Sequence, residues 1–140
     1  MIRIEIPVLP TPWAAPKMTR SGMVYDIRSK EKKWLRWHVK QLYKSFPVQG
    51  YVVVDFTFFF PVPASTTKKK KALMLAGEII PTRADCTNLQ KLTEDCIKNI
   101  IISDDRFVAK ISSQKLYGEK ENIIIKIWTL REFRDAVSYR

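Results

Sequence analysis

The sequence predicts an α+β fold in which two helices pack on a mixed, mostly antiparallel sheet, in the order β-α-β-α-β-β. Two observations carry this prediction. Segments 51–60 and 122–130 are dense in β-branched and aromatic residues, whereas segments 27–45 and 88–101 repeat apolar residues at helical spacing. The 140-residue chain has no internal repeat and no linker-like stretch, so we expect one domain over residues 1–140.

The N-terminal third is predicted to contain a strand, a proline-rich loop and a basic helix. Residues 3–9 alternate as a strand does, and the next segment is kept extended by Pro7, Pro10, Pro12 and Pro16. The helix over 27–45 should bury a stripe of Trp34, Leu35, Val39 and Leu42. Its other face is basic, with Lys30, Lys32, Lys33, Arg36, Lys40 and Lys44. We expect the four tryptophans and Phe58–Phe60 in the core, and His38 on the helix surface or in packing.

The rest of the chain is predicted to alternate strands with one more helix. Residues 51–60 form a strand with at least one buried face, and 65–80 form a mobile basic loop with at most one helical turn. A capping box of Thr87 and Gln90 places the start of the second helix at Asn88. Strands over 107–117 and 122–130 are expected to form a hairpin that turns near Gly118, before a short helix or tail from residue 131.

Composition excludes several classes of protein. No run of 18 apolar residues is present and the first 15 residues do not look like a signal peptide, so no membrane span is expected. The two cysteines, Cys86 and Cys96, suit a reducing compartment, and we expect a cytoplasmic protein. Four scattered glycines build neither a GxGxxG nor a Walker loop, so we expect no nucleotide cofactor. A single histidine argues against a Cys/His zinc site and against a Ser/His/Asp triad.

The net charge of +11 favours a phosphate-bearing partner, either a nucleic acid or an anionic membrane surface. One acidic region interrupts this basic chain, because residues 81–105 contain five acidic and three basic side chains. Carboxylates repel phosphates, so a simple DNA-binding module gains nothing from them. They are useful where Mg²⁺ must meet a phosphodiester. The other interpretation is a solvated acidic surface.

Each acidic residue also has a plain structural interpretation. Asp85 suits the start of a helix, Lys91 and Asp95 are spaced as a surface ion pair, and Asp104-Asp105 suits a turn. Asn88, Lys91 and Asp95 share one helix face, opposite a buried stripe. Asp104 and Asp105 follow the helix, so they approach Asp85 only if the next strand runs back along it. Together the acids favour a metal site modestly.

The string Asp85-Cys-Thr-Asn-Leu-Gln-Lys91, the later Asp95, and Asp104-Asp105 followed by Arg-Phe-Val resemble the RusA family of Holliday junction resolvases. That family carries Asp-x-Asp-Asn-Leu-x-Lys, then a helix with a further Asp, then an Asp-Asp pair opening a strand. The likeness extends to the N-terminal strand, the proline-rich loop, the basic helix and the lysine-rich segment. It implies a RusA-like fold and a phage-type, Mg²⁺-dependent endodeoxyribonuclease that resolves four-way DNA junctions in recombination and repair.

The sequence departs from this family at one position, because the second Asp of the motif is Thr87 here. A threonine cannot be an anionic ligand, although its hydroxyl can cap a helix or coordinate weakly. Either Asp95 or Asp104 supplies the missing charge, or the protein is a weak or silent nuclease that only binds branched DNA. We favour the first explanation.

The resemblance also implies roles for individual residues. Asp85 and Asp105 are the first-choice metal ligands and catalytic carboxylates, and Asp104 and Asp95 are the second choices. Lys91 would stabilise the phosphate or the leaving oxygen. Thr87 and Asn88 would lie next to the metal ligands and help to position them.

A homodimer is implied as well, because a C2 pair of active sites suits two symmetric nicks in a nearly two-fold junction. We expect the DNA backbone to contact basic residues of the proline-rich loop, the first helix and the lysine-rich segment: Lys17, Arg20, Lys32, Lys33, Arg36, Lys68, Lys69, Lys70 and Lys71. Replacing them should weaken binding to all DNAs and flatten its salt dependence.

Two further hypotheses remain open. A PD-(D/E)xK nuclease needs an acid, one residue and a lysine on a strand after the first acid, and no convincing example follows Asp85 or Asp105. An RNA- or anion-binding module with an acidic face for a protein partner would show no divalent-metal dependence and would tolerate Asp85→Asn.

Overall fold

Four strands form one mixed sheet in the computed structural model, which describes residues 1–138. The strand order is β1-β6-β4-β5, with bounds β1 Ile2–Ile6, β4 Val52–Pro61, β5 Val108–Gly118 and β6 Asn122–Thr129. β6 pairs antiparallel with both β1 and β4, and β4 pairs parallel with β5. The predicted α+β class and the mixed, mostly antiparallel sheet are therefore confirmed.

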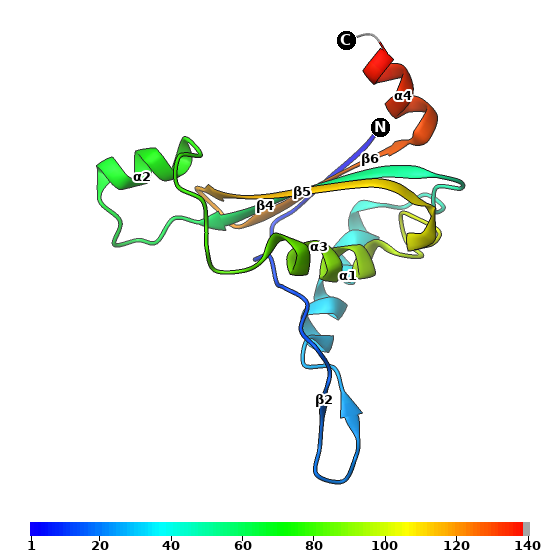
Figure 1. Ribbon diagram of the computed structural model, residues 1–140, viewed down its shortest axis with the longest axis horizontal. Helices are drawn as coiled ribbons and strands as arrows, with labels where there is room; N and C mark the ends of the chain where they lie inside the picture. Colours follow the sequence, from blue (N-terminus) through cyan, green and yellow to red (C-terminus); the bar gives the residue numbers. More distant parts are fainter. Residues whose placement is uncertain (139–140) are drawn as a thin grey trace.

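The helices occupy different sides of this sheet (Figure 1). Helices α1 (Ser29–Leu42) and α3 (Cys86–Ile97) cover one face, whereas α4 (Leu130–Ser138) lies on the other side. The last two residues of the C-terminal helix or tail predicted from residue 131 fall outside the described residues. Among residues 1–138, no helix has the length and apolar character needed to cross a membrane.

The core lies between the sheet and the pair α1 and α3. Alternate side chains of β4 point to this face and are fully or almost fully buried, namely Val52, Val54, Phe56, Phe58 and Phe60. They pack with apolar side chains of the two helices, including Leu35, Val39, Leu89 and Leu92. The alternation follows from the two-residue period of a strand, and the helix stripes from the 3.6-residue period. The core therefore holds both helices against one face of the sheet.

The predicted hairpin of the last two strands is wrong, because β4 lies between β5 and β6. The connection over residues 119–121 joins two strands that do not pair with each other. The physical reason lies in β4, whose second face is also covered: Val53 is 3% and Thr57 8% exposed. A strand buried on both faces takes a central position, with hydrogen-bonded neighbours on both edges.

Two segments predicted as loop are ordered. Residues 65–80 contain an eight-residue helix, α2 (Lys68–Leu75), whose N-cap Thr67 accepts a hydrogen bond from the Lys70 backbone N–H at 3.3 Å. Lysine, alanine, leucine and methionine all favour helix, which outweighs the repulsion within the lysine run. The proline-rich loop leads into a short hairpin of β2 (Lys17–Met18) and β3 (Val24–Tyr25). Figure 1 shows this hairpin projecting away from the sheet.

The predicted burial of α1 is only partly correct. Leu35 and Val39 are buried, but Trp34 is 57% exposed, Trp37 50% and Leu42 50%. The other two tryptophans, Trp13 and Trp128, are half-buried. Only the narrow stripe with Leu35 and Val39 packs against the core, and the rest of the α1 surface faces solvent. The expectation that all four tryptophans lie in the core is therefore wrong.

Polar contacts hold α1 against its neighbours. The Arg36 guanidinium donates to the carbonyl oxygen of Asp95 at 3.0 Å and to that of Lys98 at 3.4 Å. The buried Cys96 thiol donates to the Lys32 carbonyl at 3.8 Å, and burial raises the pKa of this thiol to about 12. Cys96 is therefore a packing residue and stays protonated at neutral pH.

The Asp26–Lys32 ion pair fixes the base of the β2–β3 hairpin to α1. The Asp26 carboxylate accepts hydrogen bonds from Lys32 Nζ and from the Arg28 backbone N–H, both at 2.8 Å. The bond from Lys32 is the largest cause that lowers the pKa of Asp26 below its ordinary 3.8. A carboxylate with a lowered pKa stabilises the folded state above its unfolded pKa, and this contribution is lost as pH falls through the folded pKa.

We therefore expect Asp26→Asn to lower the Tm by a few degrees at most at pH 7, and to have little effect near pH 3. Thermal melts from pH 7 to pH 3 measure this difference. The Lys32→Met variant serves as the matched control, and the double variant should show non-additive losses at pH 7. An Asp26→Asn penalty that persists unchanged at low pH would contradict the ion-pair explanation.

Candidate active site

Asp85 is the N-cap of α3, and its carboxylate makes no capping hydrogen bond. Its backbone is extended, with φ −75° and ψ 134°, and its carbonyl oxygen accepts the Leu89 N–H at 3.0 Å. The residue is exposed. A free carboxylate at this end of the helix is favoured by the positive end of the helix dipole. It is therefore available to an external ligand.

The predicted start of this helix at Asn88 is wrong by two residues. The helix begins at Cys86, so Thr87 lies within its first turn and Asp85 takes the capping position. Aspartate ranks above threonine as an N-cap residue, and here the earlier residue adopts the cap conformation. Thr87 is exposed and lies two residues after Asp85 in the chain.

Trp13 of the proline-rich loop contacts α3 at Asn88 and at Lys91. The Trp13 backbone N–H donates to the Asn88 carbonyl at 2.8 Å, which attaches the proline-rich loop to α3. Lys91 Nζ then lies over the Trp13 ring, 3.5 Å from its centroid, in a cation–π contact. Lys91 is exposed, so its charge remains accessible to a ligand.

A lysine of β5 reaches the start of α3. Lys115 Nζ donates to the Ala84 carbonyl at 2.6 Å, next to Asp85 in the chain. Strand β5 does run back along α3, which is the condition under which Asp104 and Asp105 were expected to approach Asp85. The β5 residue that contacts the start of the helix is Lys115, at the Ala84 carbonyl, and not one of the predicted aspartates.

The other predicted carboxylates lie at the opposite end of α3. Asp95 is ten residues beyond Asp85, about 15 Å along the helix axis. Asp105 lies near the same C-terminal end, because its Oδ1 is 3.8 Å from Lys98 Nζ. Burial, followed by the charges of Asp105 and Asp95, raises the pKa of Glu94. The acidic candidates therefore form two separate locations within one chain.

Asp104 has a local structural role at the start of the 3₁₀ turn Asp105–Phe107. Its carboxylate accepts the Arg106 backbone N–H at 3.0 Å, and this bond is the main cause of its lowered pKa. Within residues 1–138, no three acidic, cysteine or histidine side chains converge into a group that could hold a metal ion. Mg²⁺ commonly uses only one or two carboxylates together with substrate phosphates, and the exposed Asp85 carboxylate fits that donor chemistry.

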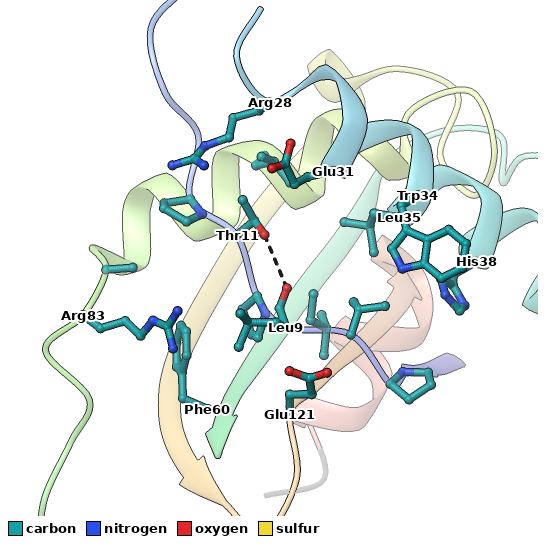
Figure 2. A pocket seen from close by; sticks show the side chains of 17 residues that line it. Leu9, Thr11, Arg28, Glu31, Trp34, Leu35, His38, Phe60, Arg83 and Glu121 are labelled. Carbon is teal, nitrogen blue, oxygen red and sulfur yellow. Dashed lines mark hydrogen bonds between the residues drawn. The ribbon is translucent and has the colours of Figure 1, made fainter. Parts of the chain in front are cut away.

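A cleft of about 800 Å³ adjoins the Asp85 end of α3. Arg83 and Ala84, the two residues before Asp85, line it together with Arg28. Figure 2 shows Arg83 on one side of the cleft and Trp34 with His38 on the other, with Leu9 and Thr11 between them. The cleft also contains Glu31 and Glu121, so its lining has mixed charge.

The predicted DNA-contact residues differ in whether their side chains already make polar contacts within the protein. Lys32 pairs with Asp26 and Arg36 binds carbonyl groups of α3, so both are engaged within the protein. Lys71 pairs with Glu119 at 3.3 Å. The remaining candidates are exposed, on the hairpin, α1 and α2: Lys17, Arg20, Lys33, Lys68, Lys69 and Lys70.

Sequence reasoning did not single out Trp13, Lys115 or Arg83. Lys115 reaches Asp85 only through the parallel pairing of β4 and β5, and Trp13 only through the course of the proline-rich loop. No local pattern marks either residue.

A comparison with protein families supplies the deciding observation. The family model described as Endodeoxyribonuclease RusA matches residues 7–128 of the 140. The chain belongs to the RusA family. It is therefore an endodeoxyribonuclease of the Holliday junction resolvase class, which acts in DNA recombination. No curated protein matches the sequence. The match extends from the proline-rich loop into β6, and so includes every candidate residue around Asp85.

Proposed function

We propose that this RusA-family protein is a Mg²⁺-dependent resolvase, a homodimer of single-domain chains that makes paired, symmetric nicks in four-way DNA junctions. The observation that carries the proposal is the Asp85 carboxylate, which makes no capping hydrogen bond. It lies at the N-terminus of α3, close to Lys115 and on the same helix as Lys91. A hydrolytic site for a phosphodiester needs this combination of a carboxylate and nearby cations.

Asp85 would hold the divalent ion at this end of α3. When bound, such an ion activates water and neutralises charge on the phosphate. Lys91, whose ammonium group lies against the Trp13 ring, offers a fixed positive charge to the phosphate oxygens. Lys115 fixes the backbone that leads into Asp85, and the Trp13–Asn88 hydrogen bond fixes the first turns of the helix. Thr87 adds a neutral oxygen where the family motif has a second carboxylate.

Asp105, with Asp104 and Asp95, would hold an ion at the other end of α3. The approximately 15 Å that separates Asp95 from Asp85 along the axis is too long for one ion to bridge within a chain. The two locations therefore act separately in a protomer, or meet only between the two chains of a dimer.

The test is cleavage of a synthetic mobile four-way junction against a linear duplex of the same sequence, with Mg²⁺ or with EDTA. We expect cuts in the junction alone, at symmetric positions on opposing strands, and none in EDTA. End labels on each strand report the paired positions, and sedimentation reports the dimer. Tight junction binding without cleavage would instead identify the branched-DNA binder suggested by Thr87. Equal cutting of duplex and junction would contradict the proposal.

A further inference from the structure

Two tryptophans form an exposed aromatic surface on α1 that the proposed catalytic mechanism does not use. Trp34 and Trp37 are spaced three residues apart, so they share a helix face. Their rings are nearly parallel, with an interplanar angle of 3° and centroids 5.4 Å apart. His38 lies edge-on to both rings, at 4.6 Å from Trp34 and 5.1 Å from Trp37. The histidine therefore packs against both rings.

This surface also carries free positive charge. A shallow groove over α1 is lined by Lys30, Lys33 and the two tryptophans, together with Glu31. Within residues 1–138 neither Lys30 nor Lys33 forms a salt bridge, whereas Lys32 on the same helix is paired with Asp26. Exposed indole rings beside unpaired lysines are the combination that binds single-stranded nucleic acid, through base stacking and phosphate attraction. Tryptophan is enriched in protein–protein interfaces but lysine is depleted in them, so it is the two lysines beside the rings that favour a nucleic acid over a protein partner.

The aromatic surface is continuous with the cleft beside the candidate active site. Trp34 and His38 line that cleft, and Arg83 and Ala84 line its other side next to Asp85 (Figure 2). A DNA strand whose phosphate lies at Asp85 can therefore follow the cleft towards Trp34.

We propose that Trp34 and Trp37 form a stacking platform for an unpaired base at the branch point of the DNA substrate, with Lys30 and Lys33 on the adjacent phosphates. The proposal rests on the proposed function, because it assumes that branched DNA is the substrate. The centroid separation of 5.4 Å leaves no room for a base between the two rings, so the base stacks on the outside of the pair. Paired bases of a linear duplex are already stacked and do not use the platform.

The experiment measures binding in EDTA, so that it does not depend on cleavage. The variants are W34L, W37L and the double variant, with W34F and W37F as conservative replacements. Leu42→Ala is the matched control, an exposed apolar residue of the same helix. The probes are a junction with one unpaired thymidine at the crossover, a fully paired linear duplex and a short oligothymidine.

We expect the double Leu variant to bind the junction and the oligothymidine at least tenfold more weakly, and the duplex less than twofold more weakly. The Phe variants should retain most of the affinity, and the salt dependence should stay unchanged.

A second measurement uses the unmodified protein and does not depend on the folding of any variant. A 2-aminopurine placed at the unpaired position should lose fluorescence on binding, because it stacks on an indole ring. Unchanged fluorescence, or equal binding by wild type and the double Leu variant, would overturn the platform. A shift from dimer to monomer in the double Leu variant would overturn it as well, and would assign the surface to a protein interface. Failure of the proposed function appears separately, as the absence of junction cleavage by the wild type in Mg²⁺.

Discussion

Asp85→Asn is expected to reduce junction cleavage at least about 100-fold while leaving junction binding intact. The carboxylate supplies the charge with which this helix end would hold a divalent ion. Such an ion stabilises the transition state by several kcal/mol, and each loss of roughly 1.4 kcal/mol lowers the cleavage rate about tenfold. Binding should persist or tighten slightly, because a negative charge near the phosphate is removed. Asparagine is also a good N-cap residue, so the helix is expected to form normally.

Single-turnover cleavage of the mobile junction and a binding titration in EDTA measure the two effects for Asp85→Asn. Asp135→Asn is the matched control, since Asp135 is an exposed aspartate of α4, on the other side of the sheet. Asp105→Asn is measured in parallel. Full cleavage by Asp105→Asn would confine the catalytic metal to the N-terminal end of α3. Full cleavage by Asp85→Asn would refute the proposed site.

Lys91→Met is expected to reduce cleavage by about 100- to 1000-fold, the usual cost of removing one fixed group that stabilises transition-state charge. The loss should appear in the rate of the bound complex, with an unchanged Mg²⁺ requirement, because Lys91 is not a metal ligand. Rates at saturating protein over a series of Mg²⁺ concentrations measure both quantities. Lys120→Met is the matched control, as an exposed lysine of the connection between β5 and β6.

Trp13→Leu separates the position of Lys91 from its charge. Without the ring at 3.5 Å, the ammonium group stays present but becomes mobile, so we expect a smaller decrease, about tenfold. Trp13→Phe should recover part of this loss, and the backbone bond to Asn88 remains in both variants. Equal rates for Trp13→Leu and wild type would show that Lys91 needs no support from the loop.

Local patterns in the sequence determined most of the elements. The dense β-branched and aromatic runs of β4 and β6 predict strands from residue propensity, and the apolar stripe of α3 predicts a helix from its period. The motif from Asp85 to Lys91 predicted the family from identity and spacing alone. These features depend on residues that are close in the chain, so they can be recognised without knowing the fold.

Only the tertiary structure decided which of these residues meet. The central position of β4 separates β5 from β6, and its parallel pairing with β5 brings Lys115 rather than Asp105 to Asp85. The twelve-residue length of α3 places Asp85 and Asp95 at opposite ends, and the narrow packing of α1 leaves Trp34 and Trp37 in solvent. The physical reason is common to all three cases. Strand order, direction and helix packing arise from contacts between residues far apart in the chain, and hydrophobic burial favours any arrangement that covers the same apolar area.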